Sequence, residues 1–391
     1  LGDWPAWQRA ATDLFERALE TAHVPTMEAA LDALMHLAAD RGAEDEMMRH
    51  ARSLSELSRD SSWALAWASA RIDFGMGRPQ DAIDKIRAAM GDREGVPLAS
   101  ERRLELGALE AEVLTSHGWL AEAEIAVKVQ SDLAARLSDR AASVHAALMQ
   151  ASLLREAQSP DKALAELRRL GAELGDDRFY RLDGRLAVEL ARAHLEFGWC
   201  ETAREHLAQG VALAQRDGDR ETLLYGRLID ARVVALLGRP DRAMEMIDLA
   251  REDGGGLPRL ALRELEYSEL EVGLAGGSGV APERLFDAAR RLAVAAQGEG
   301  IRTLSVKAIA LSARAAILLG LADEALHLAQ TALERSGEWG GVGVPRHQLL
   351  FLLARARHVR RDGFRAKRTL GQAKAQLHQL ARLLVDPAQR A

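Results

Sequence analysis

The chain has 391 residues, a net charge of −6 at pH 7 and a hydrophobic fraction of 48%, of which few residues are aromatic. This hydrophobic fraction excludes a disordered chain, and the mild negative charge gives no general signal for nucleic-acid binding. Cys200 is the single cysteine, so an intramolecular disulfide is excluded and a reducing, cytoplasmic location is predicted. No apolar run approaches the roughly 18 residues of a membrane span, and no signal peptide is recognisable.

Residues with high helix propensity dominate the composition, namely Ala, Leu, Arg and Glu. Their side chains lose little rotamer freedom on a helix, so the composition predicts an all-α protein. Residues 1–25, with Trp4, Trp7 and Phe15, are predicted to form one amphipathic helix that caps the helical stack or joins an upstream domain. The chain begins at Leu1 rather than Met, which suggests a fragment of a longer polypeptide.

From residue 26 onward one short pattern recurs: a helix that ends in Gly, a turn of two or three residues, and a second helix that opens near an Ala. The turn residues and their following alanines are Gly77 and Ala82, Gly118 and Ala123, Gln158 and Ala163, Gly198 and Ala203, Gly238 and Ala243, and Gly320 and Ala325. Gly takes the left-handed conformation at a helix end without steric cost. Weaker copies turn at Gly42 and Gly363.

A small residue stands seven positions before each turn. These residues are Ala70, Ala111, Ala151, Ala191, Ala231, Ala313 and Ala356. Small residues there and at the opening Ala let the two helices of a pair cross closely. Between pairs, the phrases at 138–140, 175–178 and 218–220 place an Asp where it is expected to cap the next helix.

This register of small residue, Gly and small residue resembles the tetratricopeptide repeat, over roughly residues 26 to 385. The turns at 77, 118, 158, 198 and 238 are 40 or 41 residues apart, longer than the family's usual period. The long helices and Gly-Asp-Arg junctions resemble the superhelical sensor arrays of large bacterial regulators, the LuxR-type (STAND) ATPases and kinase-linked proteins. The resemblance implies a right-handed α-solenoid of eight or nine helical hairpins.

The predicted organisation has five parts. A capping helix at 1–25 precedes repeats at 26–257, a degenerate Gly-rich repeat at 258–300, C-terminal repeats with a basic end at 301–385, and a tail at 386–391. Gly-rich stretches at 253–256, 273–279 and 336–343 interrupt the pattern. Plain loop lengthening explains them, with a hinge near residue 275 as the alternative.

Catalytic and cofactor motifs are absent from the sequence. It contains no G-x-x-x-x-G-K-[ST] loop, no H-E-x-x-H, no C-x-x-C and no G-x-S-x-G, and its histidines are scattered singly. We therefore predict that the protein is not an enzyme and has neither a cofactor nor a metal site.

The family that the chain resembles lines its concave groove with the first helix of each pair. When the turn residue is numbered 15, position 9 faces the groove, and here five of seven repeats have Arg at that position. The predicted partner-binding residues are Arg71, Val188, Arg192, Leu195, Tyr225, Leu228, Arg232, Arg314, Arg357 and Arg360. Arg guanidinium groups bind carboxylates through two parallel hydrogen bonds. Beside apolar groups they suit an acidic or amphipathic segment of another protein or peptide. Alternatively, these Arg side chains pair with helix neighbours such as Glu189 or Glu196.

The sequence supports three functional hypotheses. The first is a non-catalytic scaffold or sensor module for protein–protein interaction in bacterial cytoplasmic signalling. The second is the ligand-sensing repeat domain of a larger ATPase or kinase transcriptional regulator. The third is nucleic-acid binding through residues 344–391. This segment contains eleven Lys or Arg and only two acidic residues, although no base-reading motif accompanies them. A homo-oligomer, in which the basic end docks on an acidic part of another copy, also remains open.

Overall fold

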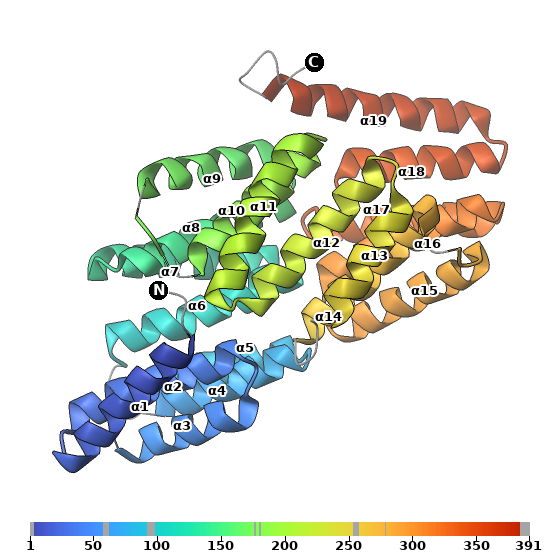
Figure 1. Cartoon of the computed structure of the whole chain (residues 1–391). Helices are drawn as coiled ribbons and strands as arrows, with labels where there is room; N and C mark the ends of the chain where they lie inside the picture. Colours follow the sequence, from blue (N-terminus) through green and yellow to red (C-terminus); the bar gives the residue numbers. More distant parts are fainter. Residues whose placement is uncertain are drawn as a thin grey trace.

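The computed structural model describes residues 4–57, 62–91, 98–175, 177–179, 181–252, 258–277 and 279–383, and in these ranges it contains helices and no strand. In chain order (Figure 1) the elements are α1 (Trp4–Glu20), α2 (Val24–Asp40), α3 (Glu44–Leu57), α4 (Ser62–Gly75), α5 (Pro79–Met90), α6 (Ser100–His117), α7 (Leu120–Leu137), α8 (Arg140–Glu156), α9 (Pro160–Leu174), α10 (Leu182–Glu196), α11 (Cys200–Asp217), α12 (Arg220–Leu236), α13 (Pro240–Glu252), α14 (Arg259–Val272), η1 (Gly273–Gly277), α15 (Pro282–Gly298), α16 (Arg302–Leu318), α17 (Ala322–Glu338), α18 (Arg346–Val359) and α19 (Gly363–Leu383).

The described helices after α1 form nine consecutive pairs, from α2 with α3 to α18 with α19, and α1 packs against α2. Each pair packs mainly within itself and against the next pair, which is the arrangement of an α-solenoid. The all-α solenoid fold predicted from the repeat register is therefore confirmed. In Figure 1 the helices α1 and α19 lie at opposite ends of the molecule.

The turn and the small residues have the predicted local structure. Gly77, Gly118, Gly198, Gly238 and Gly320 all have φ between 71° and 78°, as a left-handed helix end requires. Gln158 takes the same turn with φ of 60°, although it has a side chain. The seven alanines that precede the turns, and the six that open the second helices, are at most 1% exposed. A larger side chain at any of these positions would push the paired helices apart.

Two of the three expected Asp caps are present. Asp139 accepts a hydrogen bond from the Ala142 backbone at 2.9 Å, and Asp219 accepts one from the Thr222 backbone at 3.1 Å. The third expected cap is wrong, because α10 begins only at Leu182. Asp176 lies outside the described residues, and Asp177 forms an ion pair with Arg140 instead.

The predicted degenerate repeat at 258–300 contains a helical pair, α14 and α15. Its glycines at 273–277 form a single π-helical turn, in which Gly276 has φ of 102°. A hinge near this turn remains a prediction. The Gly-rich stretch at 253–256 and the predicted tail at 386–391 lie outside the described residues.

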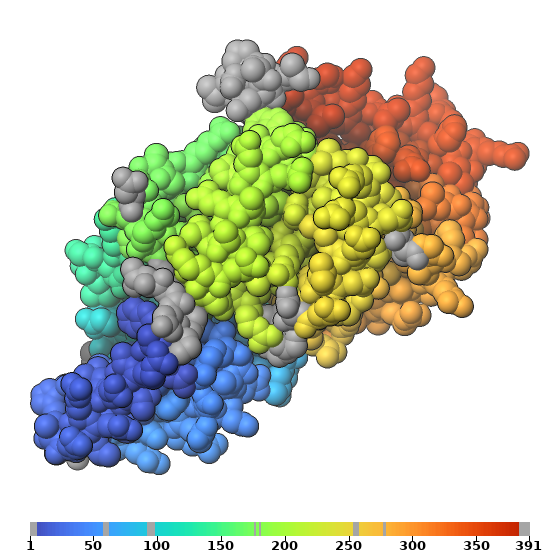
Figure 2. Space-filling view, in the orientation of Figure 1, coloured from blue at the N-terminus to red at the C-terminus, as the bar shows by residue number. Residues whose placement is uncertain are grey.

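The solenoid closes on itself edge to edge. Helices α4 and α6 contact α14 and α16, and one hydrophobic core cluster contains side chains from both regions. We call this line of contact the seam: it joins the hairpin turns at 77–79, 118–120 and 158 to the junctions at 299–303 and 339–346. Figure 2 shows the central repeats, in green and yellow, covering one face between the N-terminal and C-terminal parts.

Hydrogen bonds across the seam involve residues that sequence patterns do not connect. The Trp119 indole Nε1 donates to the Gly300 carbonyl oxygen at 3.2 Å. Gln158, the turn residue without Gly, donates to the Gly341 carbonyl oxygen and accepts from the Arg346 backbone nitrogen at 3.0 Å. The Gly-rich stretch at 336–343 is thus more than a lengthened loop, because it supplies one side of the seam.

None of the described helices is long and apolar enough to cross a membrane.

Candidate functional site

A cavity of about 430 Å3 lies on the concave side, and the first helix of eight consecutive pairs contributes to its wall. These helices are α2, α4, α6, α8, α10, α12, α14 and α16. Because the seam closes the superhelix, helices from the N-terminal and C-terminal repeats face one another across this space. The volume lies within the range of about 300–1,000 Å3 that is usual for ligand pockets.

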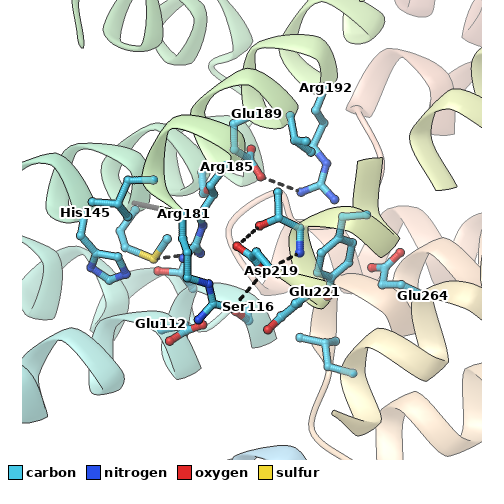
Figure 3. Close-up of a pocket in the computed structure, with 18 of the residues that line it drawn as sticks. Glu112, Ser116, His145, Arg181, Arg185, Glu189, Arg192, Asp219, Glu221 and Glu264 are labelled. Atoms are coloured by element: carbon cyan, nitrogen blue, oxygen red, sulfur yellow. Dashed lines mark hydrogen bonds and ion pairs between the residues drawn. The ribbon is translucent and has the colours of Figure 1, made fainter. Parts of the chain in front are cut away.

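Charged side chains of both signs dominate the cavity wall (Figure 3). The bases are Arg71, Arg155, Arg181, Arg185, Arg192 and Lys307, and the acids are Asp40, Glu112, Glu156, Glu189, Asp219, Glu221 and Glu264. Apolar surface comes from side chains such as Trp67, Val188 and Tyr225. The wall is therefore amphipathic and nearly balanced in charge, rather than cationic throughout.

Four of the ten predicted partner-binding residues line this cavity: Arg71, Val188, Arg192 and Tyr225. The Arg71 guanidinium binds the Glu112 carboxylate on the next first helix at 3.0 Å. The Arg192 guanidinium binds Glu189 at 3.2 Å and lies 5.7 Å from the centre of the Tyr225 ring. Both Arg side chains therefore bind a carboxylate of the same chain and also border the cavity.

The other six predicted residues lie outside the cavity wall. Leu195 and Leu228 pack into hydrophobic clusters between repeats. Arg232 and Arg314 share Glu271, at 2.6 Å and 3.7 Å. Arg357 donates a hydrogen bond to the Thr369 hydroxyl, and Arg360 binds Asp323 at 2.8 Å.

Each Arg of the predicted row thus has a partner within the chain, as the pairing alternative expects. That pairing does not test whether a ligand also binds there, so partner binding by these residues stays a prediction.

Two ion pairs cross the cavity between distant repeats. Arg181, a non-glycine residue with φ of 63°, binds Asp40 on α2 and also Asp219 at the start of α12, at 3.0 Å. Arg71 on α4 lies 3.9 Å from Glu221 on α12. These contacts hold α12 against the N-terminal repeats.

The carboxylates of the wall respond differently to the same burial. Burial raises the pKa of Glu112, but Arg71, Arg185 and His145 outweigh it, so the Glu112 pKa is lowered. Burial also raises the pKa of Glu221, and there Arg71 only partly offsets the effect. Burial lowers the pKa of His145 to about 4, so this imidazole is neutral at pH 7.

Several cavity residues were not predicted, and one of them has a sequence signal. Arg185 lies seven positions before Arg192, so it holds the same place in its repeat as Tyr225 and Lys307, which also line the cavity. Arg181 and Glu221 lie before position 1 of their repeats, when the turn residue is numbered 15. No pattern in the sequence marks them as cavity residues.

A cluster that includes His36 of the cavity wall has the donor atoms of a possible metal site. Asp32, His36 and Glu105 place ligand atoms within 4.8 Å of one another. The Arg102 guanidinium, however, donates to Asp32 at 3.0 Å and to Glu105 at 2.8 Å, so a cation already neutralises the carboxylates. Burial lowers the pKa of His36, but Asp32 and Glu105 outweigh it and raise that pKa to about 9. The donor set therefore fits an internal salt-bridge network with a protonated imidazole better than a metal ion.

Solved structures share this architecture. A Rap protein complexed with competence and sporulation factor has a TM-score of 0.62 and 14% identity, over 86% of this chain and 96% of that chain. Aspartyl phosphate phosphatase F from Bacillus subtilis has a TM-score of 0.52 and 11% identity, over 77% of each chain. The chain has a tetratricopeptide-repeat-like fold. At these identities the likeness concerns the fold alone.

A STAND protein with a tetratricopeptide repeat sensor from Pyrococcus horikoshii also matches, over 84% of this chain and 52% of that chain at 12% identity. Its TM-score is 0.45. No protein-family model matches the sequence, and no curated protein matches it significantly.

Proposed function

We propose that this protein is a non-catalytic receptor or sensor module that binds a short segment of a partner protein or peptide in the central cavity. The observation that carries the proposal is the cavity itself, because eight first helices contribute side chains to one amphipathic wall. Pockets of this kind combine apolar contact surface with a few polar groups that fix orientation. An extended segment with at least one acidic group fits the Arg side chains of the wall.

The comparison with the Rap protein supports the same proposal. That protein, which shares the fold over most of both chains, was solved in complex with competence and sporulation factor. We extend this to the present chain as a proposal and place it in a bacterial cytoplasmic regulatory system. The closed seam favours a sensor over a passive scaffold, because a ligand that contacts eight repeats at once changes how they pack.

Selection of random 12-residue peptides displayed on phage, against the full chain, tests the proposal. Peptides that are retained are synthesised, and their affinity is measured by calorimetry for the wild type and for Tyr225→Ala and Arg192→Ala. We expect each substitution to weaken binding about tenfold or more, since each removes a side chain from the cavity wall.

Arg360→Ala is the matched control. Arg360 belongs to the same predicted row but lies outside the cavity, where it pairs with Asp323 on the exposed surface. Equal affinity of the wild type and both cavity variants, with loss only in Arg360→Ala, would move the binding site to the basic C-terminal end and refute the proposal.

A further inference from the structure

One cation and one carboxylate at the cavity wall lack the close partner that the other charges have. Five of the six bases have a carboxylate within 3.2 Å; the pairs are Arg71 with Glu112, Arg155 with Glu156, Arg181 with Asp219, Arg192 with Glu189, and Lys307 with Glu264. The sixth base is Arg185, which forms no ion pair with any residue that the structure describes. A charge without a partner at a partly desolvated wall is costly unless something else binds it.

The Arg185 side chain projects from α10 into the cavity. Its guanidinium donates one long hydrogen bond, of 3.8 Å, to the Met149 sulfur, as Figure 3 shows. Sulfur is a weak acceptor, so the donor capacity of this guanidinium is largely unused. The half-buried Tyr225 ring, on the neighbouring first helix α12, supplies apolar surface in the same cavity wall.

The complementary group is Glu221 on α12. Its carboxylate lies 3.9 Å from the Arg71 guanidinium, beyond hydrogen-bond distance, because the closer bond of Arg71, at 3.0 Å, goes to Glu112. Figure 3 shows Glu221 beside Asp219, on the opposite side of the cavity from Glu189. Burial raises the Glu221 pKa, as expected for a carboxylate without a close cation.

We propose that the cavity selects a zwitterionic segment, whose carboxylate binds Arg185 and whose ammonium or guanidinium group binds Glu221. The remaining, apolar part of the segment packs on the Tyr225 ring. A ligand of one sign would satisfy only one of the two groups and leave the other half-buried without a close partner of opposite charge. Charge-assisted hydrogen bonds at both ends also fix the direction of the bound segment.

This inference rests on the proposed function, because it names the ligand class for the same cavity. The test uses pools of tetrapeptides with both ends capped, made from Ala, Leu and Phe with added Lys, Glu, both or neither. Each pool is dialysed against the full chain, and retained peptides are identified by mass spectrometry. Wild type should retain peptides with one Lys and one Glu at least about tenfold better than the other three pools.

Two variants assign the charges. Arg185→Gln should abolish the preference for Glu-containing peptides and keep that for Lys, whereas Glu221→Gln should do the reverse. Arg204→Gln and Glu201→Gln, an exposed pair on α11 outside the cavity, are the matched controls and should bind like the wild type. Circular dichroism confirms that each variant is folded.

The outcomes separate this inference from the proposed function. Retention that is lost in Tyr225→Ala but is independent of peptide charge would overturn the zwitterion inference and leave peptide binding in the cavity intact. Retention by Arg185→Gln and Glu221→Gln with unchanged preferences would overturn it as well. If no pool is retained by the wild type, both the inference and peptide binding in this cavity are refuted.

Discussion

Trp119 and Gly300 are 181 residues apart in the sequence, yet the Trp119 indole donates a hydrogen bond of 3.2 Å to the Gly300 carbonyl oxygen. The Arg302 guanidinium lies 5.3 Å from the centre of the same indole ring. Trp119 stands directly after the turn residue of its hairpin, at a place where the other repeats have Arg78, Ser159, Trp199, Arg239 and Leu321. A single side chain therefore connects the third pair of helices to the start of the eighth.

Replacement of Trp119 should weaken the seam in two separable ways. Trp119→Phe removes the hydrogen bond and should lower the free energy of unfolding by about 1 kcal/mol. Trp119→Ala also removes the packing, and should cost about 2 kcal/mol because the ring is only half-buried. Urea unfolding measures both. Trp7→Ala, at a side chain that is 53% exposed, is the control and should change stability by less than about 0.5 kcal/mol.

Gly343 should not tolerate a side chain. A Cβ there would lie 2.6 Å from the Thr303 carbonyl oxygen and 2.9 Å from the Val306 Cβ, and φ is 89°. Gly198 has a similar φ of 78°, but a Cβ there would meet no atom within 4 Å. Gly198→Ala should therefore lower the free energy of unfolding by about 1–2 kcal/mol, from backbone strain alone. Gly343→Ala should cost about 2 kcal/mol more, and equal losses in urea unfolding would show that the loop does not press on α16 as described.

Two helical glycines should respond to Ala with opposite signs. A Cβ at Gly210 on α11 would lie 2.8 Å from Val188 Cγ2 and 3.1 Å from the Gly184 carbonyl oxygen, so Gly210→Ala should destabilise the protein by about 1–2 kcal/mol. Gly171 on α9 has open space, so Gly171→Ala should stabilise by about 0.5–1 kcal/mol. Melting temperatures of both variants check this, and a stabilised Gly210→Ala would contradict the close approach of α10 and α11.

His117 should make the protein sensitive to mild acid. This fully buried imidazole donates from Nδ1 to the Val113 carbonyl oxygen at 2.9 Å, and burial lowers its pKa to about 4. Because the unfolded state has the higher pKa, near 6.5, stability is complete above that pH and falls as the pH drops toward 4. At pH 5 the His117 contribution to the loss is about 2 kcal/mol relative to neutral pH.

The comparison that isolates this effect uses His117→Leu, which removes the titrating group. Its free energy of unfolding should fall less between pH 7.5 and pH 5 than that of the wild type, whatever its absolute value. His378→Gln, at an exposed position on α19, should follow the wild type. Parallel pH profiles of all three proteins would exclude His117 as the acid-sensitive group.

The repeat architecture was predictable because its determinants are local. A left-handed turn at Gly118 and a small residue at Ala111 are needed for any such hairpin, wherever the hairpin lies. The seam was not predictable, because closure depends on small rotations that add up over all repeats. Nothing around Gln158 indicates that its side chain will bind the loop near Gly341.

The candidate site was predictable only in part for the same reason. Arg185, Tyr225 and Lys307 share one position of the repeat and all line the cavity, whereas Arg192 and Arg232 share another and only Arg192 does. Position within a repeat decides which helix face a side chain occupies. Whether that face borders the cavity depends on the curvature at that repeat, which no short pattern encodes.

Edge-to-edge closure also determines at what point of synthesis the cavity wall of this protein can become complete. The first hairpins fold from local contacts as soon as they are synthesised, but the Gly300 and Gly341 sides of the seam are synthesised more than 180 residues after the turns that they contact. Until then the cavity lacks the α16 wall that carries Lys307, and the turns at Gly77 and Gly118 are uncovered. A chain still being synthesised therefore lacks the complete cavity wall, and folding should finish with a slow step dominated by contacts of large sequence separation.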